Sequence, residues 1–167
     1  MSRLFVAIAA LAAVCHAAAN QPLDVPFFHQ QTNGCGAASV AMVLHYWDKQ
    51  EAPERVYQQL YKSAQKGILL SDMKRYLEES GFRAFTLRGE WNDVEQHLAK
   101  GRPIIVGLKK NRAARIHFAV VIGADHDHVW LNDPTRKKPS RVNRAGFQKQ
   151  WTMAERWMLL STPAAAN

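Results

Sequence analysis

The sequence predicts a single α+β domain, in which a helical first half packs on an antiparallel β-sheet from the second half. Residues 36–47 are apolar almost all round, which is typical of a helix buried at the centre of a domain. Short apolar or alternating runs dominate after residue 100 and favour strands. Residues 20–167 are enough for one compact core and too few for two domains. Helices grouped before an antiparallel sheet indicate the α+β class.

The remaining elements follow from local signals. Pro53 suits a helix start, Ser71 and Asp72 predict an N-cap, and Gly81 and Gly101 are typical helix stops. We therefore expect helices over 36–47, 53–65, 71–81 and 91–100 and a helical turn over 147–151. Strands are expected over 82–87, 103–108, 116–123, 128–133 and 157–161.

Cys35 stands between two glycines where the helix over 36–47 begins. A helix N-terminus carries partial positive charge and unpaired N–H groups, which stabilise a thiolate over a thiol. The thiolate is the form that attacks a carbonyl carbon, so this position suits a nucleophile. Gly34 and Gly36 leave the approach uncrowded and allow a tight turn into the helix. A buried cysteine that fills apolar space is the alternative interpretation.

Residues 1–19 predict a secretory signal peptide that is removed at its end. They run from the positive Arg3 through an apolar core too short to span a bilayer to a row of alanines. Cys15 offers a lipoprotein alternative, which the bulky residue before it disfavours. Removal of this segment leaves Cys35 as the one cysteine of the mature domain, 20–167, without a disulfide partner. We expect a periplasmic or extracellular protein with a reactive thiol.

His117 lies on an apolar predicted strand, where a polar side chain needs a partner. A five-residue loop over 123–127 would set Asp133 directly opposite His117 on the same sheet face, with Cβ atoms about 5 Å apart. The carboxylate would then orient the imidazole and stabilise its charged form, as in nucleophile–base–orienter triads. A histidine satisfied within the core is the alternative interpretation.

Acyl transfer also needs two donors that converge on an oxyanion. The backbone N–H of Cys35 can supply one, and a side-chain amide from the preceding loop can supply the other. Gln30 and Gln31 both suit that role, and the residues themselves leave the choice open.

The chain is basic, with a formal net charge of +8. Basic residues gather in two clusters, over 109–115 and 136–138. Such clusters attract anionic membranes, acidic cell-wall polymers or acidic peptides, although solvated loops are the simpler interpretation. No interleaved aromatic residues or nucleic-acid module accompany them, so we expect no nucleic-acid partner. No second apolar run of bilayer length follows residue 20, so membrane contact would be peripheral.

Three segments in order resemble papain-like cysteine peptidases, most of all the bacteriocin-processing peptidases that cleave double-glycine leader peptides. The first is the segment over 26–44, which contains Cys35. The second is His117 with the apolar strand that follows it, and the third is the Asn132-Asp133-Pro134 motif. The resemblance covers most of the mature domain and implies the papain-like peptidase fold.

By this resemblance Cys35 is the nucleophile, His117 the general base, Asp133 its orienter and Gln30 the oxyanion donor. Many members place the glutamine six residues before the cysteine, a position that His29 holds here. The resemblance implies a peptide or protein substrate and no cofactor or metal. Transporter-linked members also carry a membrane domain and an ATPase, so neither ATP binding nor cleavage coupled to export is implied here. The oligomeric state is left open.

Three other functions compete with peptide hydrolysis. Phytochelatin synthases look similar around the cysteine and transfer a peptidyl group instead of hydrolysing it. A peptide- or wall-binding module without catalysis could keep the same fold, although the intact triad argues against it. The turn over 125–128 carries metal-binding residue types, but its spacing lacks the pattern of structural zinc sites. His45 and His97 lie on predicted helices without identified partners.

Overall fold

The computed structural model describes residues 21–165. The predicted signal peptide, with Cys15, lies outside the described residues. The elements are α1 (Cys35–Tyr46), α2 (Pro53–Leu60), a 3₁₀ helix η1 (Ser63–Gln65), α3 (Leu70–Glu79), β1 (Phe82–Arg88), α4 (Trp91–Ala99), β2 (Ile104–Leu108), β3 (His117–Ala124), β4 (His128–Asn132), β5 (Ser140–Asn143), α5 (Arg144–Met153) and β6 (Trp157–Pro163).

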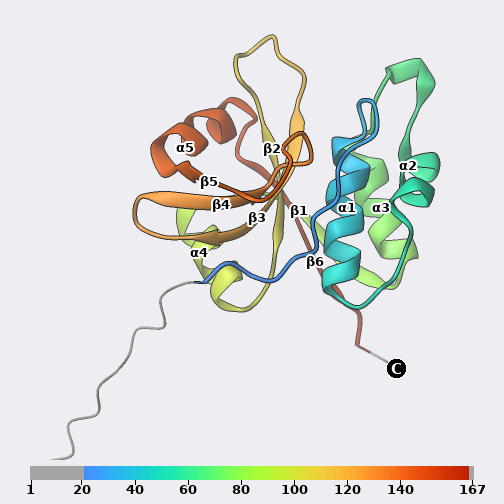
Figure 1. Cartoon of the computed structure of the whole chain (residues 1–167), viewed down its shortest axis with the longest axis horizontal. Coiled ribbons are helices and arrows are strands. Elements are labelled where there is room, and N and C mark those ends of the chain that lie inside the picture. Colours follow the sequence, from blue (N-terminus) through green and yellow to red (C-terminus); the bar gives the residue numbers. More distant parts are fainter. Residues whose placement is uncertain (1–20, 166–167) are drawn as a thin grey trace, which may run out of the picture.

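A six-stranded antiparallel sheet separates two layers of helices (Figure 1). Its strand order is β1-β6-β2-β3-β4-β5, so the last strand inserts between the first and the second. Helices α1, α2 and α3 lie on one side of the sheet, while α4 and α5 lie on the other (Figure 1). The predicted α+β class, with a helical half packed on an antiparallel sheet, is confirmed.

Helix α1 forms the centre of the larger core, between the sheet and the other two helices of its layer. Met42 and Leu44 on this helix are fully buried. This burial explains the sequence pattern, because a helix enclosed on all sides needs apolar residues on all sides. Truncating Leu44 to alanine would cost about 2–5 kcal/mol of stability. The helix therefore gives its first residue, Cys35, a rigid base.

Several predicted boundaries are wrong. Helix α2 ends at Leu60, where the chain turns into η1, and α3 begins at Leu70 without a side-chain cap. Strand β5 was not predicted, because its four residues have only one apolar side chain. Pairing with β4 at the sheet edge creates this strand. Helix α5 is longer than the predicted turn, since the Asn143 side chain caps its first N–H groups.

No helix within residues 21–165 combines the length and the apolar character that crossing a bilayer requires.

Candidate active site

Cys35 is the first residue of α1 and is half-buried. No side chain caps this helix, so the first N–H groups of α1, next to the thiol, are not satisfied by a capping side chain. The flanking glycines serve packing as well as access. A Cβ on Gly34 would lie 2.8 Å from the Tyr57 ring, and one on Gly36 would lie 2.9 Å from Met73 Sδ. The glycines thus let α2 and α3 approach the start of α1 closely.

His117 is the first residue of β3, and its Nε2 lies 2.8 Å from Asp133 Oδ1. The imidazole also interacts with the Cys35 thiol, with which it lines the same hollow. Asp133 Oδ1 also accepts hydrogen bonds from Thr135, at 3.0 Å from the backbone N and 2.7 Å from Oγ1. The structure therefore brings together the three residues of the predicted triad and adds Thr135, which fixes the carboxylate.

The predicted contact between His117 and Asp133 is present, but the predicted hairpin register is wrong. Strand β3 continues to Ala124, so the five-residue loop over 123–127 does not form. Val121 pairs with Leu131 and Gly123 pairs with Trp130, which leaves Ile122 as a β-bulge. Extending the register beyond β4 sets residue 133 opposite residue 119, so Asp133 reaches the histidine diagonally.

The bulge decides which face of the sheet Asp133 occupies. At the hairpin tip, Ala124 pairs with Val129, and that register without a bulge would set residue 133 opposite residue 120. Residues 117 and 120 point to opposite faces, because side chains alternate along a strand. One extra residue shifts the register by one and returns Asp133 to the face of His117.

The N-terminal segment, residues 21–31, is tied to this hairpin at three points. The N–H of Leu23 donates to the carbonyl of the bulged Ile122 at 2.7 Å. The buried Asn132 donates through Nδ2 to the Val25 carbonyl at 2.9 Å. The N–H of Gln30 donates to the Pro134 carbonyl at 3.2 Å. These bonds hold the loop before α1 against the end of β4.

Of the three candidates for the oxyanion donor, Gln30 lies in the hollow that contains Cys35 and His117. This hollow has a volume of about 200 Å³ and is also lined by Asn33, Gly67, Ile68, Arg115, Ile116 and Phe118. His29 and Gln31 are exposed and do not line it. The Gln30 Oε1 atom is buried without a hydrogen-bond partner among the described residues, so its amide group is not committed elsewhere.

The electrostatics favour a thiolate beside an imidazolium. Burial opposes charge on Cys35, but hydrogen bonds to His117 and to backbone groups lower the pKa of the thiol below its ordinary value. Burial likewise opposes charge on His117, yet its bonds to Asp133 and Cys35 raise its pKa to about 9. Burial would raise the pKa of Asp133, but the bonds from His117 and Thr135 hold it at about 2.

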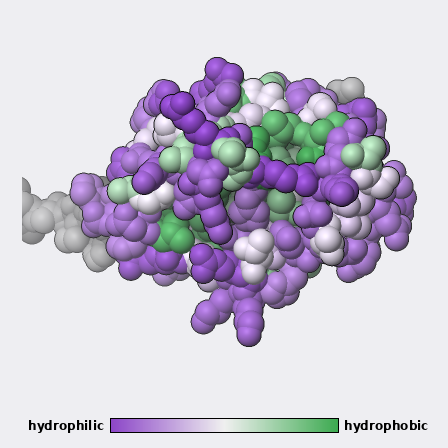
Figure 2. Space-filling view, turned by 90° about the horizontal axis from the view of Figure 1, so that it is seen from above, coloured by the Kyte–Doolittle hydropathy of each residue, from purple (hydrophilic) through white to green (hydrophobic). Residues whose placement is uncertain are grey.

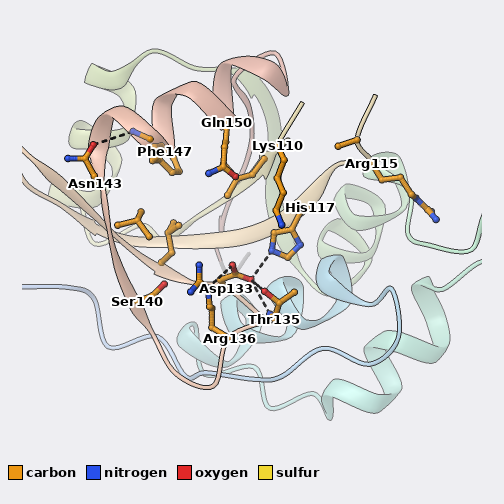
Figure 3. A pocket seen from close by; sticks show the side chains of 15 residues that line it. Lys110, Arg115, His117, Asp133, Thr135, Arg136, Ser140, Asn143, Phe147 and Gln150 are labelled. Atoms are coloured by element: carbon orange, nitrogen blue, oxygen red, sulfur yellow. Dashed lines mark hydrogen bonds and ion pairs between the residues drawn. The ribbon is translucent and has the colours of Figure 1, made fainter. Parts of the chain in front are cut away.

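A larger groove adjoins the site on the α5 side of the sheet (Figure 3). Its volume is about 670 Å³, and it shares His117 and Arg115 with the smaller hollow. Asp133 and Thr135 line it, whereas Cys35 does not. The imidazole therefore lies where two hollows meet.

His45, His97 and the turn over 125–128 lie outside the candidate active site. In the turn over 125–128, Asp125 accepts backbone hydrogen bonds from residues 127 and 128 and pairs with Arg141. No metal-binding cluster forms within residues 21–165. His45 bonds the Glu51 carbonyl at 2.8 Å, while the Nδ1 of His97 is buried without a partner among the described residues.

Sequence reasoning missed three residues that position the site. Thr135 follows the Asp-Pro motif by one residue and could have been read as a cap for the aspartate. Asn132 was recognised only as part of that motif, and nothing local indicates its bonds to residues 25 and 26. Arg115 donates to the carbonyls of Gln65 and Lys66, at 2.9 Å each, across a long sequence separation.

The chain is similar to known peptidases. The family model described as "Peptidase_C39 like family" matches residues 22–158. The chain is 32% identical over 124 residues to the probable functional amyloid protease FapD of Pseudomonas fluorescens, with 70% of this chain and 52% of that protein covered. It is 25% identical over 128 residues to the processing and transport protein LagD of Lactococcus lactis, with 75% and 17% covered. The chain thus spans about half the length of the first relative and a small part of the second.

Solved structures give the same result. A double-glycine motif protease from an AMS/PCAT transporter, crystallised with its leader peptide, is 27% identical with a TM-score of 0.68. That match covers 86% of this chain and 94% of the protease. A C39-like peptidase from Bacillus anthracis is 17% identical with a TM-score of 0.69, at 88% and 99% coverage, and supports the fold. With its family model matched over most of its length, the chain belongs to the Peptidase_C39 like family of cysteine-type peptidases.

Proposed function

We propose that this protein hydrolyses peptide bonds, with Cys35 as nucleophile, His117 as general acid and base, and Asp133 as the group that orients the imidazole. The observation that carries the proposal is the arrangement of the three side chains: Cys35 and His117 line one hollow, and His117 Nε2 lies 2.8 Å from Asp133 Oδ1. Gln30 and the backbone N–H of Cys35 are the proposed oxyanion donors.

The reaction begins when the Cys35 thiolate attacks the scissile carbonyl carbon and its oxygen becomes an oxyanion. The imidazolium of His117 then protonates the leaving amine as the C–N bond breaks and a thioester forms. Neutral His117 next takes a proton from water, and the resulting hydroxide attacks the thioester. Collapse of this second intermediate releases the thiolate beside the imidazolium formed in the previous step, together with a carboxylic acid product that loses its proton to solvent.

We also propose an exported protein that acts on polypeptides. The pattern of residues 1–19 supports export. The relatives named as a functional amyloid protease and as a protease bound to a leader peptide support a polypeptide substrate. N-terminal sequencing of protein from a periplasmic or culture fraction tests export, and an uncleaved N-terminus inside the cytoplasm would contradict it.

A peptide library digested by the wild type, by Cys35→Ala and by Gln31→Ala tests the activity. We expect cleavage by the wild type and by the exposed-site control Gln31→Ala, and none by Cys35→Ala. A thiol-directed peptide electrophile should label the same two proteins. Labelling of Cys35→Ala would mean that another group reacts. A second digestion contains glutathione as a competing acceptor. Glutathione adducts in place of free carboxylate products would indicate peptidyl transfer instead of hydrolysis.

A further inference from the structure

The two basic clusters of the sequence lie on either side of one groove. The first occupies the loop between β2 and β3, and the second occupies the loop between β4 and β5. Lys110 from the first and Arg136 from the second line the large groove beside His117. Their side chains enter the groove from opposite sides (Figure 3). Clusters about 25 residues apart in sequence thus meet at a single place that opens onto the candidate catalytic residues.

The groove also has an apolar floor. Leu108, Leu131 and Phe147 are buried beneath it, and the half-buried Val142 continues the same surface. Seen from above Figure 1, the surface as a whole is largely hydrophilic, with smaller hydrophobic areas between the hydrophilic ones (Figure 2). A floor of this kind can accept one or two apolar side chains.

The charges at the groove are unbalanced. Asp133 is the only carboxylate among its lining residues, and it is occupied by His117 and Thr135. Lys110 forms no ion pair with any residue in the described part of the chain. Arg136 lies 3.7 Å from Asp133, and Arg115 turns away toward the carbonyls of the loop before α3 (Figure 3). The groove therefore presents a cationic rim above an apolar floor, because three basic side chains line it against the single carboxylate of Asp133.

We infer that this groove selects substrates: it binds a segment of the peptide substrate that combines acidic side chains with an apolar one. This inference rests on the proposed peptidase function and names the substrate class for the same site. Acidic groups of the segment would pair with Lys110 and Arg136, while the apolar side chain would cover Phe147 and its neighbours. Because His117 lines the groove, a segment bound there would lie next to the reacting bond. A flat membrane surface could meet the rim but not the floor.

Binding to the inactive Cys35→Ala protein tests the inference without catalysis. The probes are two fluorescein-labelled ten-residue peptides that share two leucines and differ in three positions, glutamate in one and glutamine in the other. We expect the glutamate peptide to bind about five- to tenfold more tightly at low salt, because two exposed ion pairs supply an effect of that size. High salt should reduce the difference.

Charge reversal tests whether the groove causes the preference for the glutamate peptide. Lys110→Glu, in the Cys35→Ala background, should abolish the preference for glutamate. Lys149→Glu makes the same charge change on an exposed α5 residue that does not line the groove, and should keep the preference. Equal affinity for both peptides would overturn the inference, and so would equal loss in the two variants. Binding to phosphatidylserine vesicles that Lys110→Glu abolishes, with peptide binding unchanged, would assign the rim to membranes and overturn it as well.

The outcomes also separate this inference from the proposed function. Preferential binding of the glutamate peptide without cleavage of any peptide by the wild type would contradict the peptidase proposal and leave the groove assignment standing. Cleavage of both peptides at equal rates, with equal binding, would support the peptidase proposal and contradict the groove assignment.

Discussion

The two halves of the candidate active site are built in different ways. On the helical side, Cys35 and its glycines form one continuous stretch, and α1 carries the thiol at its first residue. On the sheet side, His117 and Asp133 come from two strands, and their contact depends on the bulge at Ile122. The first half depends on local conformation, whereas the second depends on strand register.

The two halves therefore contribute differently to the reactivity of the thiol. The helical half sets the reactive group, and the hairpin half sets its charge state through the bonds from Cys35 to His117 and on to Asp133. Substitutions in the two halves should therefore change different observables. A change on the hairpin side should alter the pH dependence and the rate of thiol alkylation. A change to the oxyanion donor should alter turnover alone.

Loss of the imidazole should have the largest effect. His117→Ala should lower kcat/KM for peptide cleavage by roughly 10³–10⁴-fold, since general acid–base catalysis and thiolate formation are lost together. The rate of Cys35 alkylation by iodoacetamide at neutral pH should fall as well. His126→Ala, in the exposed hairpin turn, is the matched control and should behave as wild type. Unchanged alkylation in His117→Ala would mean that another group activates the thiol.

Loss of the proposed oxyanion donor should separate turnover from thiol reactivity. Gln30→Ala should reduce kcat by about 10²–10³-fold, the usual effect of removing one such donor. Its Cys35 alkylation rate should stay near that of the wild type, because the amide does not set the charge of the thiol. Gln31→Ala serves as control. If Gln31→Ala lost turnover and Gln30→Ala kept it, the donor would be the neighbouring glutamine.

Neutralising the orienting carboxylate should shift the pH dependence. Activity needs protonated His117, so it should fall above about pH 9 in the wild type. Asp133→Asn keeps an acceptor for the ring N–H but removes the negative charge. The pKa of His117 and the alkaline limb of kcat/KM should then move to lower pH, with a rate loss of about 10–100-fold.

Asp125→Asn is the matched control for that shift. Asp125 lies at the other end of the same hairpin, and its pKa is also lowered to about 2, despite the opposing effect of desolvation, by backbone N–H groups and Arg141. It does not contact His117, so its loss should leave the alkaline limb in place. Equal shifts in both variants would indicate a general charge effect.

The smallest effect should come from the tie between the hairpin and the N-terminal segment. Asn132→Ala leaves the Val25 carbonyl without its buried donor and should lower the free energy of unfolding by about 1–3 kcal/mol. Urea denaturation measures this change. Asn92→Ala, exposed on α4, should have almost no effect. Hydrogen exchange in residues 21–31 should rise in Asn132→Ala alone, and equal exchange in both variants would argue against the tie.

The sequence was sufficient for the fold class and for the residues that meet at the site, because each has a local or chemical signature. Cys35 begins an apolar helix, and a histidine on an apolar strand requires a partner. The register was not predictable, since the bulge at Ile122 has no signature in an apolar strand. Its position is fixed by contacts with the packed sheet and with Leu23, distant in sequence. Strand β5 was missed for a related reason, because pairing with β4 creates this strand, and not the β propensity of its own residues.

The ties of residues 21–31 also determine how far the chain can be shortened. Among the described residues, none of the hydrogen bonds that tie this segment to the hairpin involves a residue before Leu23. Maturation or recombinant trimming that stops at residue 20 therefore preserves the anchorage, and a purification tag is best attached there. A cut only a few residues further would detach the support of the bulge from a domain whose reactive centre lies about a dozen residues downstream.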